Sequence, residues 1–460
     1  MLAHDDTIAA IATPPGVGGI GIVRVSGPDA EKLCRTLFRS PTVSAPLKSH
    51  HLYHGDIISP ETGSVIDEVL ITLMREPHSY TGEDVLEIHC HGGRLIVQAV
   101  LNEVIRAGAR PAERGEFTRR AYLNGRMDLT QAESVMDLIT ARTNRGRALA
   151  LSGVKGDLSK KLSFLRTTLI ELLSSLESEI DFDSEDISHR YDAVTSDNIG
   201  DIINRIDHLL ATYREGRLVR DGLTVVITGR PNVGKSSLLN TLLGERRAIV
   251  TSIAGTTRDF IEEDISIEGI PVTLTDTAGI RKSSEPIEKE GIAFVWEKIL
   301  AADIVIILID GSVTLTEDDL EIIDRNRSKQ ILLVVNKSDL PHQIDRCRLK
   351  KLVPGVEPLW ISAKYGDGIP ELKKRIVATA TGSGDNTESD VTLTNLRHKS
   401  ALEKTAASLK EAQASLASGN SPELAAFALK EALNHLADIV GETTAGDVLN
   451  TIFARFCVGK

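Results

Sequence analysis

The sequence predicts a multidomain α/β protein: an α+β domain comes first, and a second α/β domain is inserted into an α-helical bundle. Three observations predict this class. Strand-like runs with glycine and proline turns fill the first quarter of the 460 residues, two separate segments have helical texture, and a block of alternating apolar strands and helices lies between them. The expected boundaries are residues 1–120, 121–215, 216–381 and 382–460. Insertion is tolerated where domain termini lie close together, although two separate helical pieces would fit the same texture.

The first domain is expected to be α+β. Its strand candidates are the runs GIGIVRV, DEVLITL and DVLEIHC, and its helix candidate is Arg94–Ala107. Gly16, Gly18 and Gly21 fit the GxGxxG spacing of dinucleotide-binding loops, but a β-branched run follows where that fold requires a helix. We interpret these glycines as a turn that enters a strand.

Both helical segments carry apolar residues at spacings of three and four, which is typical of packed helices. The stripe in the first segment predicts a long helix and consists of Leu158, Leu162, Leu165, Leu169, Leu172, Leu176 and Ile180. A heptad in the second segment consists of Leu402, Leu409 and Leu416. Proline at 422, after serine, is typical of a helix start, and Gly441 is expected to end that helix. The polar segment 382–390 is interpreted as a linker.

The inserted block contains five short runs rich in β-branched residues: LTVVIT, PVTLTD, DIVIILID, ILLVVN and PLWIS. Such continuous hydrophobicity is typical of parallel strands that are buried on both faces. The block is therefore predicted to form a parallel sheet covered by helices.

Composition excludes several classes. No run of about 18 apolar residues is present, so no membrane span is expected, and the first residues lack the basic and apolar regions of a secretory signal. Four widely spaced cysteines are typical of a reducing cytoplasm, which is the expected location: Cys34, Cys90, Cys347 and Cys457. The net charge of −12 excludes a generally basic nucleic-acid coat, but not a local basic surface.

The segment from Gly229 to Ser236, GRPNVGKS, matches the pattern GxxxxGK[ST]. The strand LTVVIT precedes it and the helical run SSLLNTLL follows, which is the context that a phosphate-binding P-loop requires. The backbone N–H groups of such a loop form a nest for phosphates. Lys235 is expected to reach the β- and γ-phosphates, and Ser236 is expected to bind Mg²⁺.

Further motifs follow in the order of a GTP-binding domain. Thr256 and Thr257 in AGTTRD offer a threonine for Mg²⁺ and the γ-phosphate. Asp276 ends an apolar run and opens DTAG, which places a carboxylate beside the metal, and the N–H of Gly279 can meet the γ-phosphate.

The motif NKSD at 336–339 follows the run ILLVV, and SAK at 362–364 follows PLWI. The carboxylate of NKSD can accept two hydrogen bonds from guanine, a donor pair that adenine lacks. Together these motifs predict GTP binding by Asn232, Val233, Gly234, Lys235, Ser236, Ser237, Thr251, Ser252, Ile253, Ala254, Gly255, Thr256, Thr257, Asp276, Thr277, Ala278, Gly279, Asn336, Lys337, Asp339, Ser362, Ala363 and Lys364.

One position departs from the common pattern. Many GTPases orient the attacking water with a glutamine directly after DxxG, where this chain has Ile280. Glu285, Glu288 and Glu290 lie downstream and are alternatives, although each could belong to a solvated helix face. No arginine finger can be assigned, so a substitute cation or very slow hydrolysis is expected, since such a finger contributes about 10³–10⁵ in rate.

GRPNVGKSSLLN, TSIAGTTRD, DTAGIR and NKSD resemble the TrmE-Era-Der group of GTPases. The flanking segments DTIAAIATPPGVGGIGIVRVSG, TGEDVLEIHCHGG, RPAERGEFTRRAYLNGRMDLTQAE and FCVGK are similar to those of the MnmE (TrmE) family of tRNA-modification GTPases. The resemblance covers essentially the whole chain. It implies an N-terminal folate-binding and dimerisation domain, a helical domain built from both flanks, and an inserted Ras-like P-loop GTPase domain.

The resemblance also implies partners and cofactors. The family forms a homodimer and works with the FAD-dependent partner MnmG on tRNA. It installs an aminomethyl or carboxymethylaminomethyl group at C5 of the wobble uridine, with a tetrahydrofolate derivative as the one-carbon source. Its G domains dimerise across K⁺ during GTP hydrolysis, and Mg²⁺ accompanies the nucleotide.

By similarity, four residues hold K⁺, namely Asn232, Thr251, Ile253 and Thr256, and two hold Mg²⁺, namely Ser236 and Thr257. Glu288 takes the place of the water-organising glutamate and joins Lys235 and Asp276 as the catalytic set. The positions that match the folate site are Arg24, Glu87, Arg126 and Lys460. Arg126 stands where some members have lysine, and Val458 where the usual ending has isoleucine.

Three other features of the sequence could indicate a metal site, a lipid anchor or a tRNA contact, but each also has a purely structural interpretation. His89 and His91 would share a strand face opposite Cys90, and nothing supplies further metal ligands at zinc-site spacing. Cys457 lies fourth from the last residue, but the context does not suit lipid attachment. A local basic run either contacts tRNA phosphates or is neutralised by interleaved acids; it consists of Arg106, Arg110, Arg114, Arg119, Arg120, Arg126, Arg142, Arg145 and Arg147.

Two other functions compete with tRNA modification. An Era- or Der-like ribosome-assembly switch would require a compact RNA-binding domain after the G domain, whereas residues 391–456 have helical texture. A folate-dependent enzyme with a merely regulatory G domain would fit the same motifs.

Overall fold

The computed structural model describes residues 6–41, 46–181, 192–244, 262–276, 297–382, 391–418 and 422–460. The chain divides into two compact units. One comprises Met1–Met136, Gly153–Arg166 and Leu433–Lys460, and the other comprises Asp137–Ser152 and Thr167–Ala432. Among the described residues, no helix has the length and apolar content needed to cross a membrane.

The first unit contains a seven-stranded sheet with the strand order β3-β4-β5-β6-β2-β1-β7. Neighbouring strands are antiparallel except β1 and β7, which are parallel. The strands are β1 (Ile8–Ile11), β2 (Ile20–Ser26), β3 (Phe38–Arg39), β4 (Leu52–Ile58), β5 (Val65–Met74), β6 (Val85–His91) and β7 (Arg110–Pro111). The three predicted strands are β2, β5 and β6, so the glycine-rich segment does enter a strand.

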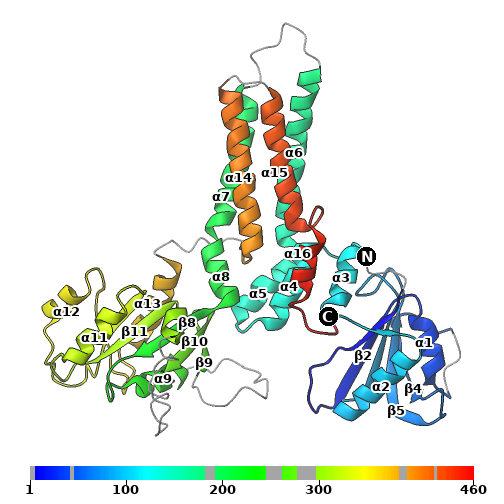
Figure 1. Cartoon of the computed structure of the whole chain (residues 1–460), viewed down its shortest axis with the longest axis horizontal. Helices are drawn as coiled ribbons and strands as arrows, with labels where there is room; N and C mark the ends of the chain where they lie inside the picture. Colours follow the sequence, from blue (N-terminus) through cyan, green and yellow to red (C-terminus); the bar gives the residue numbers. More distant parts are fainter. Residues whose placement is uncertain are drawn as a thin grey trace. The chain divides into compact units, whose positions relative to one another are not determined.

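Two helices, α1 (Ala30–Leu37) and α2 (Arg94–Arg106), pack on one face of this sheet (Figure 1). The core between them and the strands is aliphatic, and it includes Val23, Ile71, Ile88 and Val100. Helix α2 matches the predicted helix to within one residue.

Helix α3 (Glu116–Leu123) places Phe117 against Ile8 and Ala10 of β1. Beside this small cluster lies an ionic network. Its centre is Arg120, whose side chain is 5% exposed and pairs with three carboxylates. The partners of Arg120 are Asp6 at 2.6 Å, Glu83 at 3.2 Å and Glu116 at 3.2 Å.

Arg110 completes the network through Asp6 at 2.7 Å and Glu116 at 2.6 Å. Burial alone would raise the pKa of both carboxyls. The two guanidinium groups outweigh burial, so the pKa of Asp6 and the pKa of Glu116 lie below their ordinary values. The network therefore ties strand β1 to α3 with charges that stay ionised at neutral pH.

The remainder of the first unit is helical. Leu129 of α4 (Leu129–Thr140) packs with Phe453 of α16 (Gly446–Phe453) in an apolar cluster. Helix α15 (Pro422–Val440) ends at Gly441, as predicted, and the Tyr122 hydroxyl donates a hydrogen bond of 2.5 Å to the Gly441 carbonyl.

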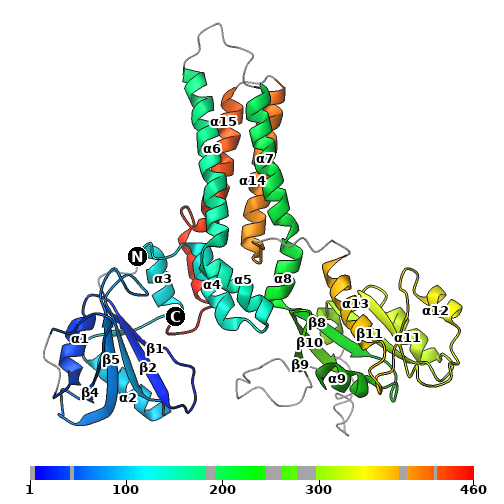
Figure 2. The same cartoon turned by 180° about the vertical axis from the view of Figure 1, so that it is seen from behind.

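Helices from both flanks form one bundle in the second unit (Figure 2). The long helices are α6 (Asp157–Asp181), α7 (Asp192–Ala211), α14 (Leu396–Ala417) and α15, of which α6 and α15 reach into the first unit. Helix α7 is followed by the short helix α8 (Tyr213–Asp221). The heptad Leu402, Leu409 and Leu416 is buried, as predicted. Five leucines of the predicted α6 stripe are buried, but at one position Leu173 is buried while the predicted Leu172 is only partly buried.

The inserted domain has a six-stranded sheet with the order β13-β12-β11-β8-β10-β9. All neighbours are parallel except β9 and β10. The strands are β8 (Leu223–Thr228), β9 (Glu262–Ile267), β10 (Ile270–Asp276), β11 (Ile304–Asp310), β12 (Ile331–Asn336) and β13 (Leu359–Trp360). The helices include α9 (Lys235–Gly244), α11 (Glu317–Arg325), α12 (Arg346–Leu352) and α13 (Ile369–Thr381). The five predicted runs are strands, but β9 was not predicted, because its sequence EEDISI is polar and lies at an edge.

The turn between β9 and β10 contacts the segment that leads into helix α5 (Asn144–Val154). The hydroxyl of buried Thr143 donates a hydrogen bond of 2.8 Å to the Gly269 carbonyl. Arg142 donates to the Asp221 carbonyl at 2.8 Å and lies 3.5 Å from Asp264. Strand β10 runs from this contact to Asp276, so the helical segment holds one end of a strand whose other end is a predicted site residue.

Replacing Arg120 with methionine is expected to destabilise the first unit by about 3–5 kcal/mol, because Glu83 would keep a largely buried charge with no ion-pair partner among the described residues and Glu116 would keep only Arg110. Hydrogen exchange of β1 and α3 in the full chain measures this loss. Arg35→Met serves as the control, because Arg35 forms an exposed pair with Glu31, which keeps Arg75.

The destabilisation should depend on pH. Because the folded pKa values of Asp6 and Glu116 are lowered, their contribution is present above their ordinary values of 3.8 and 4.5 and is lost as the pH falls through the folded values. The difference between wild type and Arg120→Met should therefore shrink in acid. A difference that is constant from pH 7 to pH 3 would contradict the ionic origin of the stability.

Candidate functional site

The predicted P-loop joins β8 to α9 at the carboxyl edge of the parallel sheet. Asn232 and Gly234 have positive φ angles of 66° and 99°. A Cβ atom at Gly234 would lie 2.3 Å from the Asn336 side-chain nitrogen, so glycine is required here by both space and conformation. The loop therefore turns sharply into α9, whose first N–H groups point to the phosphate side.

Lys235 is the first residue of α9 and is only 6% exposed. Its ammonium donates hydrogen bonds to the carbonyls of Gly229 at 2.9 Å and Arg230 at 2.7 Å. These bonds hold the charge across the loop, where it can attract a phosphate. The carboxylate of Asp319, at 2.7 Å from Arg230, holds the side chain of that loop residue.

Ser236 and Asp276 lie together, as predicted. The Ser236 hydroxyl donates a hydrogen bond of 3.1 Å to the Asp276 carboxylate at the end of β10. A hydroxyl and a carboxylate are hard oxygen ligands of the kind that Mg²⁺ prefers, so the pair fits a magnesium ion next to phosphates.

The two predicted base-recognition motifs meet through Asn336. Its amide nitrogen donates to the Val233 carbonyl at 2.9 Å, and its amide oxygen accepts from the Ala363 backbone N–H at 2.9 Å. The Ser362 hydroxyl donates to the Asp339 carboxylate at 2.7 Å. One buried asparagine thus connects the P-loop to the SAK loop, and a serine orients the carboxylate that can recognise guanine.

Other predicted residues occupy the same edge. Lys337 has a positive φ of 64°, and its ammonium contacts the Asp310 carboxylate at 2.5 Å. Burial would raise the pKa of Asp310, but the bonds from Lys337 and Ser312 outweigh it and lower the pKa. The ammonium of Lys364 lies 4.9 Å from the Tyr365 ring centre. Ser237 follows in α9 and accepts a hydrogen bond from Thr241 through its carbonyl.

Sequence reasoning missed two supporting residues. Asp310, which pairs with Lys337, ends the run DIVIILID, and a carboxylate at the end of a parallel strand was the available signal. Thr241 donates to the Ala363 carbonyl at 2.6 Å and joins α9 to the SAK loop, but a lone threonine gave no signal.

Several predicted residues lie outside the described residues and stay predictions. They are Thr251, Ser252, Ile253, Ala254, Gly255, Thr256, Thr257, Thr277, Ala278, Gly279 and Glu288.

A second polar site lies in the first unit, where three of the four predicted folate residues meet. Arg24 of β2 donates to the Glu87 carboxylate of β6 at 2.9 and 2.7 Å, because the two residues are direct partners in the ladder. Arg24 also donates to the Gly459 carbonyl at 3.4 Å, and the Lys460 ammonium lies 5.9 Å from the Tyr80 ring centre.

Tyr80 is the shared surface of this site. The Arg24 guanidinium lies 5.4 Å from the centre of its ring, and its hydroxyl is 2.8 Å from Thr118. Burial raises the pKa of the Tyr80 phenol. The pKa of Lys460 is lowered by burial and by the nearby charge of Arg24. The two cations, Arg24 and Lys460, outnumber the carboxylate of Glu87, so an anionic group would be attracted to this site.

Arg126, the fourth predicted folate residue, donates to the Ser79 carbonyl at 3.1 Å and so contacts the loop that carries Tyr80. Tyr80 was not predicted, because a tyrosine between polar residues gives no sequence signal. In β6, Cys90 is buried while His89 and His91 lie on the other face, as the alternation predicted. His89 is 3.4 Å from Glu87.

The basic run is largely engaged in ion pairs. Arg110 and Arg120 belong to the internal network, Arg106 pairs with Glu103, and Arg145 pairs with Glu215. Glu116, one of the interleaved acids, is a partner of both network arginines. These four arginines therefore have structural partners, and a contact of the rest of the run with tRNA stays a prediction.

Two family models match the chain. The model described as GTP-binding protein TrmE N-terminus matches residues 7–126, and the model described as MnmE helical domain matches residues 129–457. A tRNA modification GTPase MnmE of Syntrophus aciditrophicus is 51% identical over 99% of this chain and 99% of that protein. Proteins of the same name from Geobacter sulfurreducens and Syntrophotalea carbinolica are 46% and 45% identical over at least 99% of each chain. The likeness extends through both flanks of the inserted domain.

Replacing Asn336 with alanine is expected to weaken guanine-nucleotide binding at least about tenfold, because the Val233 carbonyl and the Ala363 N–H both lose their partner and the two loops separate. Titration with a fluorescent GDP analogue measures the affinity. Asn326→Ala is the matched control: Asn326 is also a buried asparagine of this domain, but its amide caps α11 by bonding to the Ile322 carbonyl. The control should lose stability and keep its affinity; equal losses of affinity in both variants would contradict a specific role for Asn336.

Proposed function

The chain belongs to the MnmE family of tRNA modification GTPases, and on that premise we propose how its two sites divide the work. GTP is bound and hydrolysed in the inserted domain. A one-carbon unit from a tetrahydrofolate derivative is used at the N-terminal site to build an aminomethyl or carboxymethylaminomethyl group at C5 of the tRNA wobble uridine. The observation that carries this proposal is the meeting of the P-loop with the NKSD and SAK motifs through Asn336 in one domain, together with a cationic, aromatic site in another.

In the nucleotide site, Lys235 binds the β- and γ-phosphates, and Ser236 binds Mg²⁺ beside Asp276. Asp339 accepts two hydrogen bonds from guanine, and Ser362 keeps that carboxylate oriented. The bond of 2.7 Å between these two side chains supports the assignment. By similarity to the family, the loop residues from Thr251 to Thr257 and from Thr277 to Gly279 complete the nucleotide site.

We further propose that K⁺ supplies the cation that no arginine finger provides. Asn232 and the segment 251–256 would hold it, and Glu288 would orient the attacking water with the help of Lys235 and Asp276. The position of Asn232 supports this role, because the residue lies with a positive φ of 66° in the loop that is expected to bind the phosphates. Equal rates of hydrolysis in Na⁺ and K⁺ would contradict this part.

In the N-terminal site, Glu87 is suited to the N–H and amino groups of a pterin ring, whereas Arg24 and Lys460 are suited to the carboxylates of a folate. Tyr80 offers an aromatic face, and Arg126 positions the loop that carries it. The lowered pKa of Lys460 supports an anionic ligand, because a carboxylate would relieve the repulsion from Arg24.

The proposal includes partners. We propose a homodimer formed through residues 1–120, which joins an FAD-dependent MnmG-type protein in a heterotetramer and acts on tRNA in the cytoplasm. Residues 121–215 and 382–460 would form one helical domain around the G domain, 216–381. The alternative of a ribosome-assembly switch has little support, because helices α14, α15 and α16 occupy the place of its RNA-binding domain.

Nucleoside mass spectrometry of tRNA from a knockout strain tests the function. The wild-type chain should restore the modified wobble uridine. Lys235→Ala should not, because loss of one charge that stabilises the transferred phosphate lowers hydrolysis by about 10²–10³. Lys329→Ala is a control on the same domain, since the side chain of that lysine bonds only to the carbonyl of Leu300 among the described residues.

Two results would contradict the proposal. If the wild-type chain leaves tRNA unmodified, the proposed reaction is wrong. If Lys235→Ala abolishes hydrolysis and modification persists, the G domain is only regulatory.

Replacing Glu87 with glutamine is expected to weaken binding of a stable tetrahydrofolate derivative about 10–100-fold, since a charged acceptor is lost, and to leave GTP hydrolysis unchanged. Isothermal titration calorimetry measures the affinity. Glu68→Gln is the control, because Glu68 is an exposed carboxylate of the same sheet and pairs only with His54 among the described residues. Unchanged folate affinity in Glu87→Gln would remove the pterin assignment.

A further inference from the structure

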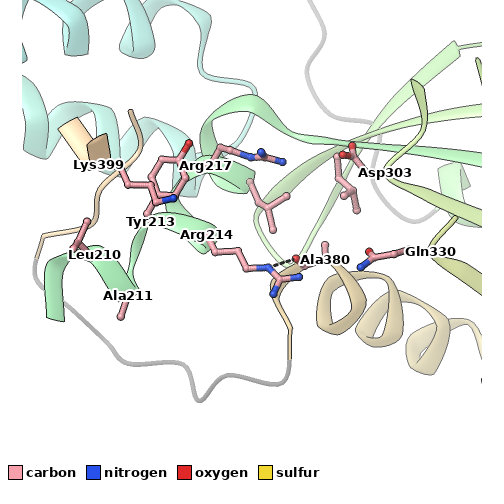
Figure 3. A pocket seen from close by; sticks show the side chains of 11 residues that line it. Leu210, Ala211, Tyr213, Arg214, Arg217, Asp303, Gln330, Ala380 and Lys399 are labelled. Carbon is pink, nitrogen blue, oxygen red and sulfur yellow. Dashed lines mark hydrogen bonds between the residues drawn. The ribbon is translucent and has the colours of Figure 1, made fainter. Parts of the chain in front are cut away.

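A cavity of about 540 Å³ lies in the second unit at the amino edge of the parallel sheet, opposite the nucleotide site. One wall is formed by α8 and the first turn of α14, and the other by residues that directly precede β11 and β12 (Figure 3). Small-molecule sites commonly have volumes of roughly 300–1,000 Å³. The cavity is therefore large enough for a mononucleotide.

The helical wall is cationic. Figure 3 shows Arg214 and Arg217 extending from α8 toward the side on which Asp303 and Gln330 lie. Arg214 is anchored by a hydrogen bond of 2.9 Å from its Nε to the Ala380 carbonyl, which uses one of its five N–H groups. Within the described parts of the chain, Arg217 is exposed and has no ion-pair or hydrogen-bond partner for its side chain.

Lys399 adds a third positive charge to the same wall. Its ammonium lies 5.2 Å from the centre of the Tyr213 ring and 3.2 Å from Glu403. Glu403 pairs with Lys399, so Arg214 and Arg217 are the cations available to a ligand, and Asp303 is the one acidic residue among the described residues of the lining. Such a surplus of cations, with planar guanidinium groups among them, favours a phosphate-bearing ligand.

The opposite wall supplies acceptors. One oxygen of Asp303 accepts the Thr224 backbone N–H at 2.9 Å, which holds the carboxylate in place. The carboxamide of Gln330 lies nearby, at the start of the next strand. The floor is apolar, with Leu218 and Leu223 each 3% exposed. The cations can bind a phosphate, the carboxylate and carboxamide can bind the hydroxyls of a ribose, and the apolar residues can pack against a base.

We propose that this cavity is a second nucleotide site, which takes a nucleoside monophosphate with its phosphate facing Arg214 and Arg217 and its ribose facing Asp303 and Gln330. The ligand would contact α8 and α14 on one side and the sheet on the other. Occupancy would therefore join helices of the bundle to the G-domain strands at the edge away from the P-loop. The site does not depend on the function proposed for either of the other two.

Equilibrium binding of radiolabelled adenosine 5′-monophosphate to the full chain tests the proposal, with the P-loop site saturated by GDP. Adenine lacks the donor pair that Asp339 requires, so the probe is kept from the first site by both occupancy and specificity. Arg217→Gln should weaken binding at least about tenfold, because a charge-assisted contact is lost. Arg147→Gln, which removes an exposed arginine of α5 outside the cavity, should leave the affinity unchanged.

Inorganic phosphate is the second probe. Weaker binding of phosphate than of the nucleotide is expected; equal affinities would overturn the nucleoside part of the proposal. No saturable binding of the nucleotide, or equal binding by wild type and Arg217→Gln, would overturn the site itself. If the nucleotide does not bind but Arg217→Gln weakens salt-sensitive binding of tRNA, the wall belongs to a nucleic-acid surface and the proposal is also wrong.

A second measurement separates ligand binding from misfolding. The nucleotide should slow hydrogen exchange in α8 and at the start of β8 in wild type and in Arg147→Gln, but not in Arg217→Gln. All three proteins should have the same exchange in the absence of the nucleotide, since Arg217 is exposed. Unslowed exchange in wild type at saturating nucleotide would contradict the assigned position.

Discussion

The side-chain amide of Asn336 is the interaction on which the nucleotide site depends. Its nitrogen binds the P-loop carbonyl of Val233, and its oxygen binds the backbone N–H of Ala363. The P-loop and the SAK loop, 130 residues apart in sequence, are thereby held at a fixed distance. Because the first is expected to bind the phosphates and the second supports the base, the distance between these two parts of the nucleotide is fixed as well. Only glycine fits at position 234, because the amide of Asn336 occupies the space that a side chain would need. A neutral amide suits the position, since it can donate and accept at once without the desolvation cost of a buried charge.

The N-terminal site is built on a different principle. Its central contact is an ion pair between Arg24 and Glu87, neighbours in a rigid antiparallel ladder, and a second cation, Lys460, stands beside them. Where the nucleotide site is organised by backbone groups and neutral bridges, this site contains charges that are incompletely balanced. The nearby network around Arg120 sets two guanidinium groups against three carboxylates, so each of its cations has acidic partners, and it serves the fold. The candidate binding site in the same unit differs, because among the described residues the ammonium of Lys460 has no carboxylate within ion-pair distance.

Much of both sites could be predicted from sequence, because motif residues at the ends of apolar runs must meet at one edge of a parallel sheet. Asp276 and Asn336 were expected at the ends of apolar runs, Lys235 and Ser236 followed from the GxxxxGK[ST] pattern between a strand and a helix, and Arg24 and Glu87 followed from resemblance. Other features depend on contacts between distant segments. The Tyr80 ring, the pair of Lys337 with Asp310 and the bond of Thr143 to Gly269 have no local pattern. Strand β9 escaped prediction because its polar sequence pairs at an edge. Between Leu169 and Leu176 the sequence could not decide between Leu172 and Leu173, because spacings of three and of four residues both fit a helical period of 3.6.

The pairing of α7 with α14 has a consequence for the order of events during synthesis. The apolar face of α7 leaves the ribosome before the G domain is made, whereas the helix that covers it emerges only afterwards. At about 5–20 residues per second, that face waits roughly ten to forty seconds for its partner. The G domain can complete its own core during this interval, since its strands and helices are contiguous in sequence. The bundle is therefore the last part of the second unit to close, and the apolar face of α7, which is mainly isoleucine, is the surface that a chaperone would meet first.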